Sequence, residues 1–204
     1  MAKNKKPKQA PKLSPENYIR QKARNLALYE CLINSDWKAS GTANIVISRI
    51  HTNGNYTVGG YMVDLLCLGV IDSYYSFNTD EDSYQELIEN MNKEFKTEKI
   101  SYTLAHNIIY ASIAYAEDLG FKPEKSFTNI TQYILDEDTE AIEFMEIECG
   151  KEGKPVYIVS EGESAVTMKQ VAAQLEKAVG KGNFTIIYAD DEEDNFYDEP
   201  SYKM

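Results

Sequence analysis

Four side chains have types and spacing that could support chemistry: Asp64, Cys67, Asp72 and His106. The first three lie in or beside the apolar stretch LLCLGV (residues 65–70), where strand ends are expected. Carboxylates at strand ends can bind a hard divalent cation, and such an ion can promote phosphodiester hydrolysis. With a third acid such as Glu117, the set is compatible with a metal-dependent hydrolase or nuclease that uses Asp64, Asp72 and His106.

Each of these residues also has a purely structural interpretation. Asp64 would be a strand-end or bulge residue that accepts hydrogen bonds from the backbone. Cys67 is flanked by leucines and would be a small core side chain, because burial in apolar surroundings raises the pKa of a thiol. His106 lies one helical turn from two tyrosines and would be a core histidine bonded to a tyrosine or a carbonyl oxygen. The choice depends on whether the four side chains converge.

Motifs for other chemistries do not occur in the sequence. It contains no HxxH, HExxH, CxxC, GxSxG or GxGxxG spacing and no P-loop. Two histidines are few for acid–base chemistry near neutral pH. Neither a metal site nor a cofactor is therefore predicted.

The composition is that of a globular protein with a core of its own. The chain has 204 residues, of which 43% are hydrophobic and 26% charged, and this excludes collagen-like, coiled-coil and wholly disordered classes. No apolar run approaches the roughly 18 residues of a membrane span, and the basic start lacks the apolar stretch of a secretory signal. Three widely spaced cysteines fit reduced thiols, so a cytoplasmic protein is expected.

Charge is divided unevenly along the chain. The whole chain carries −12 and residues 1–24 carry +7, so the remainder carries −19. We expect residues 1–13 to form a disordered basic arm and residues 190–204 a disordered acidic tail. Because an acidic body repels phosphate, contact with nucleic acid or another anionic partner falls to the lysines of the arm: Lys3, Lys5, Lys6, Lys8 and Lys12. The alternative is that both ends are merely solvating tails.

The first half of the chain predicts a helix followed by a hairpin. The helix runs from the cap at Ser14 to about Ile33. Residues 43–51 and 56–64 are predicted to form a hairpin closed by Asn53-Gly54 as a two-residue turn, with residue 49 opposite 58 and 47 opposite 60. The glycine pair at 59–60 indicates a bulge or a close approach of another group.

The remaining pattern predicts a third strand over residues 65–77 and helices over 80–96, 102–119, 130–135 and 165–179. Residues 142–149 and 156–159 are predicted to form a second hairpin, and residues 184–188 a last strand. Because these elements do not alternate as βαβ units, we expect a single α+β domain over residues 14–189. An antiparallel hairpin sheet would pack against a buried central helix, with further helices at its flanks.

Three stretches carry distinctive motifs. Gly60–Asn78 contains V-D-L-x-C-L-G-V-x-D-x-x-Y, Leu104–Pro123 reads LAHNIIYASIAYAEDLGFKP, and Cys149–Ile158 reads CGKEGKPVYI. Together with NGN at 53–55 and the arginines near residues 18–24, these motifs resemble those of a family of bacterial cytosolic proteins that has no assigned reaction. The family pattern has phenylalanine where Cys149 stands. The resemblance implies one cytosolic domain and directs attention to the four candidate positions.

These observations lead to three functional hypotheses. The first is a non-catalytic binding or accessory module in the bacterial cytoplasm, with a basic arm for an anionic partner. The second is the metal-dependent hydrolase or nuclease. The third is a small-molecule binder with a pocket between the helix at 102–119 and the hairpin sheet. Convergence of the four candidate side chains would favour an enzyme, and their dispersal would argue against one.

Overall fold

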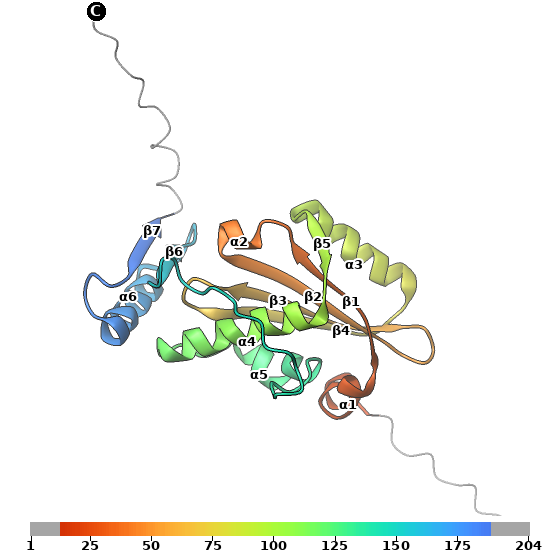
Figure 1. The fold of residues 1–204 in the computed structure, drawn as a ribbon. Coiled ribbons are helices and arrows are strands. Elements are labelled where there is room, and N and C mark those ends of the chain that lie inside the picture. The colour runs from red at the N-terminus through yellow and green to blue at the C-terminus, as the bar shows by residue number, and fades with distance from the viewer. Residues whose placement is uncertain (1–12, 189–204) are drawn as a thin grey trace, which may run out of the picture.

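The computed structural model describes residues 13–188, which Figure 1 traces from the first helix to the last strand. Residues 1–12 of the predicted arm (1–13) and the whole predicted tail (190–204) lie outside the described residues. In chain order the elements are α1 (Pro15–Lys22), the 3₁₀ turn η1 (Ala23–Asn25), β1 (Ala27–Asn34), α2 (Trp37–Ser40), β2 (Thr42–Ile50), β3 (Tyr56–Asp64), β4 (Gly69–Thr79), α3 (Glu81–Glu94), β5 (Thr97–Ile100), α4 (Tyr102–Asp118), α5 (Lys125–Asn129), the 3₁₀ turn η2 (Thr131–Tyr133), β6 (Val156–Val159), α6 (Ala165–Val179) and β7 (Thr185–Tyr188).

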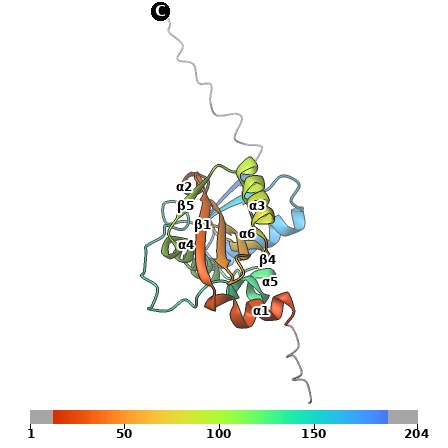
Figure 2. The same cartoon turned by 90° about the vertical axis from the view of Figure 1, so that its right-hand side faces the viewer.

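Five strands form one antiparallel sheet in the order β4-β3-β2-β1-β5. Helix α4 packs on one face of this sheet and α3 on the other, and Figure 2 shows the two helices on opposite sides of the strands. The predicted α+β class is confirmed. Within residues 13–188, no helix combines the length and the apolar character that a membrane crossing requires.

The main core lies between α4 and the sheet. Because side chains alternate along a strand, Ile45 and Ile47 of β2 both face α4 and are fully buried. Ile108 and Ile109 of α4 are fully buried against them, and Ile113 is half-buried. The prediction that this helix lies at the centre of the core is confirmed.

The hairpin between β2 and β3 is present, but the predicted register is wrong by one residue. Ile50 pairs with Tyr56, the His51 N–H donates to the Asn55 carbonyl at 2.7 Å, and the Gly54 N–H donates to the His51 carbonyl at 3.0 Å. The loop therefore has three residues, 52–54, instead of two. The physical reason is that only Gly54 takes a positive φ, 88°, which suits a turn followed by one left-handed residue.

The helix predicted to reach Ile33 ends at Lys22, and residues 27–34 form β1. Strand β1 pairs with β2 along one edge and with β5 along the other. The sequence did not reveal β5, so the pairing that overrides helix propensity in this segment was not foreseen.

Three further predictions need correction. Residues 65–68, expected to begin a strand, form the tight connection from β3 to β4. The helix expected at 130–135 is replaced by α5 and η2. The second hairpin is wrong, because β6 pairs in parallel with β7 across α6, whereas residues 142–149 form no strand. A parallel pair needs a crossover, so this end of the chain does contain the βαβ unit that was not expected.

Candidate binding groove beside α3

A groove lies between α3 and the exposed half of the sheet, and it encloses about 540 Å³. Its floor is formed by two rows of residues, and each row contains one residue from β2, one from β3 and one from β4 that are paired across the sheet. The first row is Asn44, Met62 and Asp72, and the second is Val46, Gly60 and Tyr74. One stripe of α3 forms the wall, from Ser83 through Leu87 and Asn90 to Glu94.

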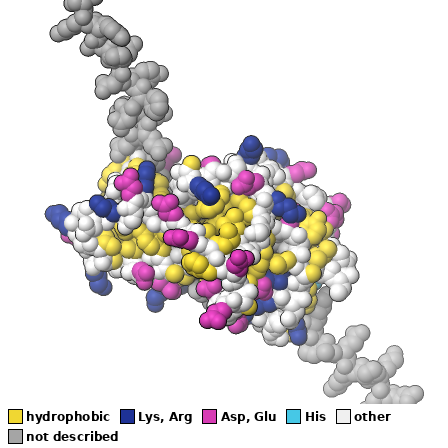
Figure 3. Space-filling model, in the orientation of Figure 1, with side chains coloured by type: hydrophobic (Ala, Val, Ile, Leu, Met, Phe, Trp, Pro, Cys, Tyr) yellow, Lys and Arg dark blue, Asp and Glu magenta, His cyan; other side chains and the backbone are white. Residues whose placement is uncertain are grey.

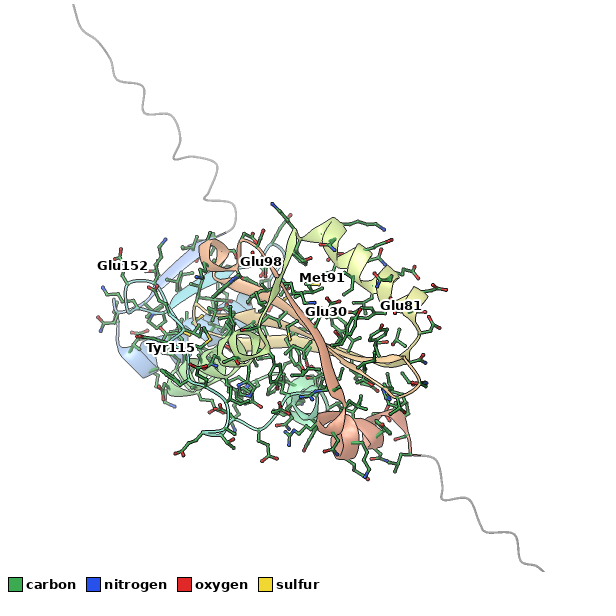
Figure 4. The ribbon with its side chains drawn as sticks, turned by 45° about the vertical axis from the view of Figure 1, so that its right-hand side comes forward. Glu30, Glu81, Met91, Glu98, Tyr115 and Glu152 are labelled. Carbon is green, nitrogen blue, oxygen red and sulfur yellow. The ribbon has the colours of Figure 1, made fainter. Side chains whose placement is uncertain are left out.

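The groove exists because a single helix covers only part of this face. Near the start of α3, Tyr84 stacks on Tyr56 with ring centroids 4.4 Å apart, and Val58 beneath them is fully buried. Figure 4 shows Met91 and Glu30 between α3 and the strands, and Glu81 at the start of the helix. Farther along, Met62 of β3 and Tyr74 of β4 remain 39% and 49% exposed. An apolar floor is thus left open to solvent.

Glycine at position 60 makes this floor possible. An ideal Cβ at Gly60 would lie 2.1 Å from Cε1 of Tyr74, so the tyrosine ring occupies the space of the missing side chain. The sequence predicted a bulge or a close approach at residues 59–60, and the register shows the close approach without a bulge there. The ring therefore lies directly against the backbone of β3 at Gly60.

The lining of the groove is acidic, with one carboxylate in the floor and two on the α3 wall. Three of its lining residues are carboxylates, namely Asp72, Glu86 and Glu94, and its described lining contains no lysine, arginine, histidine or cysteine. None of the three takes part in an ion pair among residues 13–188. The nearby Lys93 ammonium donates to the Asn90 side chain at 2.9 Å instead. Burial raises the pKa of Tyr74, and the charge of Glu94 raises it further.

Among the sequence candidates, Asp64 holds the β3–β4 turn. Its Oδ1 accepts N–H groups from Leu66, Cys67 and Leu68 at 2.6, 2.8 and 3.4 Å. Burial raises the pKa of this carboxyl, and the three backbone donors lower it by less. The structural interpretation of Asp64 as a strand-end residue bonded to backbone therefore describes its contacts.

Cys67 lies in the same turn and is fully buried, in a cluster with Leu119, Tyr157 and Leu175. Desolvation raises the pKa of its thiol well above the ordinary value, and the charge of Asp64 adds to this effect. A thiol held in the neutral form is a poor nucleophile. The contacts of Cys67 are those of a core side chain.

His106 is buried in α4, and its Nε2 lies 3.2 Å from the Asp136 carbonyl oxygen. Burial lowers the pKa of the imidazole, and the Asp136 backbone contact offsets this only in part. The loop around Asp136 is fixed by Arg49, a buried side chain that donates to the Ile134 carbonyl at 2.7 Å and to the Asp136 carboxylate at 2.9 Å. His106 therefore belongs to a structural network under the sheet.

The four candidate positions do not converge. Asp64 and Cys67 share the turn between β3 and β4. Asp72 lies on the face of the sheet that α3 covers, and His106 lies in α4 on the opposite face. Among residues 13–188, no group of three histidine, cysteine or acidic side chains is arranged to hold a metal ion. Glu117, considered as a third acid, is exposed on α4. Lys3, Lys5, Lys6, Lys8 and Lys12 lie outside the described residues.

Among the residues that build the groove, sequence reasoning singled out Asp72, Gly60 and two of the clustered tyrosines, Tyr61 and Tyr74. The others come from β2, β3, β4 and α3, and they become neighbours only through strand pairing and the packing of α3. Three comparisons, with family models, with curated proteins and with solved structures, give no match to the chain. The family resemblance of the motifs thus remains a prediction.

Proposed function

We propose that this protein is a non-catalytic binding module that captures a segment of a partner protein in the groove beside α3. The segment would carry an apolar anchor flanked by lysine or arginine. One observation carries this proposal: an apolar floor made by Met62 and Tyr74 is bordered by three carboxylates that have no basic partner in the described structure.

The shape of the groove supports a peptide segment as the ligand. Its volume of about 540 Å³ lies within the range of small-molecule and peptide sites. It follows α3 from Ser83 to Phe95, a span of about 18 Å at the rise of a helix. An apolar side chain can sit on the Tyr74 ring while cationic neighbours reach the carboxylates, and this combination favours anchoring with charge selectivity.

The chemistry of the lining supports binding over catalysis. The described lining offers carboxylates, amides, hydroxyls and apolar groups but no histidine or cysteine. The candidate catalytic residues lie in separate places, which argues against the hydrolase hypothesis. Cys31, Cys67 and Cys149 are all free thiols, which supports the proposed cytoplasmic location.

The basic arm would serve a second partner of opposite charge. Its five lysines favour phosphate or another polyanion, whereas the groove favours cations. The module would then connect an anionic partner to a basic protein segment.

The test is a pull-down from the native host with three forms of the full chain. The double variant Glu86→Lys/Glu94→Lys reverses the charge of the α3 wall, and the matched control Glu89→Lys changes an exposed acid of α3 outside the groove. We expect the wild type and the control to retain the same partner and the double variant to lose it. In calorimetry, the affinity of the double variant for the recovered segment should be lower than that of the wild type by about tenfold or more, since two attractive contacts become repulsive. Equal binding by all three forms would place the partner elsewhere.

A further inference from the structure

Residues 142–149, here called the strap, form a segment without helix, strand or turn that crosses the α4 side of the molecule. In Figure 2 it runs along the outer left edge as the teal trace after η2. It lies on the face of the sheet opposite to the α3 groove, since Ile147 and Cys149 pack against the core beneath α4. The strap is therefore a separate surface.

The strap is held in place by one side chain of α4. The Asn107 amide donates to the Glu143 carbonyl at 3.0 Å and accepts the Met145 N–H at 2.9 Å. These two contacts reproduce the pattern that a neighbouring strand would offer to one edge of a β-strand. Just beyond the strap, the Gly150 N–H on the opposite edge donates to the Leu65 carbonyl at 2.8 Å, whereas within the strap Asn107 binds the edge of Glu143 and Met145. One edge of the strap is thus tied to the protein.

The other edge of the strap is free. Backbone polar groups of an extended chain alternate between its two edges, so those of Phe144, Glu146 and Glu148 point away from Asn107. Among residues 13–188, no hydrogen bond is made by the backbone N–H or C=O of these three residues. A fixed, extended chain with an unpaired edge is a template for an added strand.

The side chains beside this edge specify the chemistry of the added strand. Phe144 is 83% exposed, which is extreme for a large apolar side chain, and Glu146 and Glu148 are exposed on the same side of the chain. From residue 126 to 150 the sequence has seven acidic residues and no lysine or arginine. Figure 3 shows this side of the molecule with hydrophobic side chains across its middle and both acidic and basic ones around them.

We infer that the strap is a strand-addition site for an extended, basic segment of a partner protein. The partner strand would pair with the N–H and C=O groups of Phe144, Glu146 and Glu148. It would place an apolar side chain next to Phe144 and lysine or arginine next to the two glutamates, because facing side chains of paired strands lie close together. The site is independent of the groove beside α3.

The experiment uses the ¹⁵N-labelled full chain and a capped heptapeptide that alternates lysine and valine. We expect binding to slow hydrogen exchange of the Phe144, Glu146 and Glu148 amides by about tenfold or more, as new backbone hydrogen bonds protect them. A second probe has the same side chains and charge, but its five central amide nitrogens are methylated. It should not bind, because it cannot donate to the strap.

Two variants separate backbone pairing from charge. Glu146→Pro removes the central N–H of the free edge, whereas Glu146→Ala removes only the carboxylate. The proline variant should lose about tenfold more affinity for the heptapeptide than the alanine variant. The inference is overturned if the heptapeptide does not bind, if the methylated probe binds equally well, or if exchange of the three amides is unchanged. If the three amides are protected without any peptide and lose this protection when residues 1–12 are deleted, the arm of a second copy occupies the strap. That result would also overturn the inference.

Discussion

Gly60 and Tyr74 face each other across β3 and β4, and the tyrosine ring fills the place of the side chain that Gly60 lacks. On the other face of the same strand, an ideal Cβ at Gly59 would lie 2.5 Å from the hydroxyl oxygen of Tyr61. The two neighbouring glycines thus accommodate two tyrosines on opposite faces. The two rings differ in freedom, because Tyr74 is half-exposed whereas Tyr61 is buried and donates to the Thr131 carbonyl at 2.9 Å.

This difference predicts unequal effects of alanine at the two glycines. Gly59→Ala should lower the free energy of unfolding by about 1–3 kcal/mol, because the buried Tyr61 cannot move aside without strain or a lost hydrogen bond. Gly60→Ala should cost less than about 1 kcal/mol, because the Tyr74 ring can swing into solvent. It should also weaken binding in the groove. Urea unfolding of both variants tests the order, and equal losses would contradict it.

The buried Arg49 predicts a large loss of stability on its removal. Its guanidinium donates to the carbonyls of Ile134, Arg24 and Leu26 and to the Asp136 carboxylate. Arg49→Leu should cost about 3–5 kcal/mol, because several buried acceptors lose their donor. The control is Lys99→Ala, which removes an exposed ammonium from its ion pair with Glu30 and should cost less than about 1 kcal/mol. Chemical denaturation measures both, and a small effect of the arginine variant would show that the loop at 131–138 relaxes freely.

His106 predicts a dependence of stability on pH. Burial lowers the pKa of its imidazole in the folded state, so the unfolded state binds more protons just below the ordinary pKa of histidine. The contribution of His106 to stability is therefore present near neutral pH and is lost as the pH falls through that window. His106→Gln should make the free energy of unfolding less sensitive to acidification between about pH 7 and pH 5.

The comparison with the variant is needed because other groups titrate in the same window. The pKa of His51 is also lowered by burial, and the repulsion within the acidic body weakens as acids are protonated. These effects are shared by the wild type and the variant, so their difference isolates His106. Parallel pH profiles of the two proteins would show that His106 does not contribute.

Two glycines with positive φ predict another pair of unequal effects. Gly54 has a φ of 88° and nothing within 4 Å of an ideal Cβ, whereas at Gly69, with a φ of 73°, that Cβ would lie 2.8 Å from the Ala116 Cβ. Gly54→Ala should cost about 1 kcal/mol, the penalty of the left-handed conformation. Gly69→Ala should cost about 1–3 kcal/mol more, because it also forces β4 away from α4. Thermal unfolding of both variants measures which one loses more stability, and an equal loss would contradict the prediction.

The arm predicts weak nucleic-acid binding that depends on salt. Phosphate contacts by its lysines release counterions, so the slope of log affinity against log salt should be about −0.9 per contact on duplex DNA. Deleting residues 1–12 should abolish this binding and leave the melting temperature nearly unchanged. A salt titration of both forms on labelled RNA and DNA provides the measurement. Binding that survives the deletion would place the site on the acidic body.

Much of the fold could be predicted from local sequence because the relevant signals are local. Capping residues and helical spacing define α3, α4 and α6, and the β-branched stretches around Asn53-Gly54 define the β2–β3 hairpin. The burial of Ile108 and Ile109 follows from a helix that is apolar around most of its circumference. The structural interpretations of Asp64 and Cys67 also followed from their immediate neighbours, a strand end and flanking leucines.

Pairing between distant segments was decided only by the tertiary structure. Residues 27–34 are a strand because β2 and β5 both bind them, and residues 142–149 stay unpaired because β6 finds its partner in β7. Both candidate surfaces have the same origin: strand register and the position of α3 bring Met62, Tyr74 and Glu94 together, and Asn107 fixes the strap. Hydrogen bonds between strands and packing on a sheet depend on residues far apart in the chain, so no local pattern encodes them.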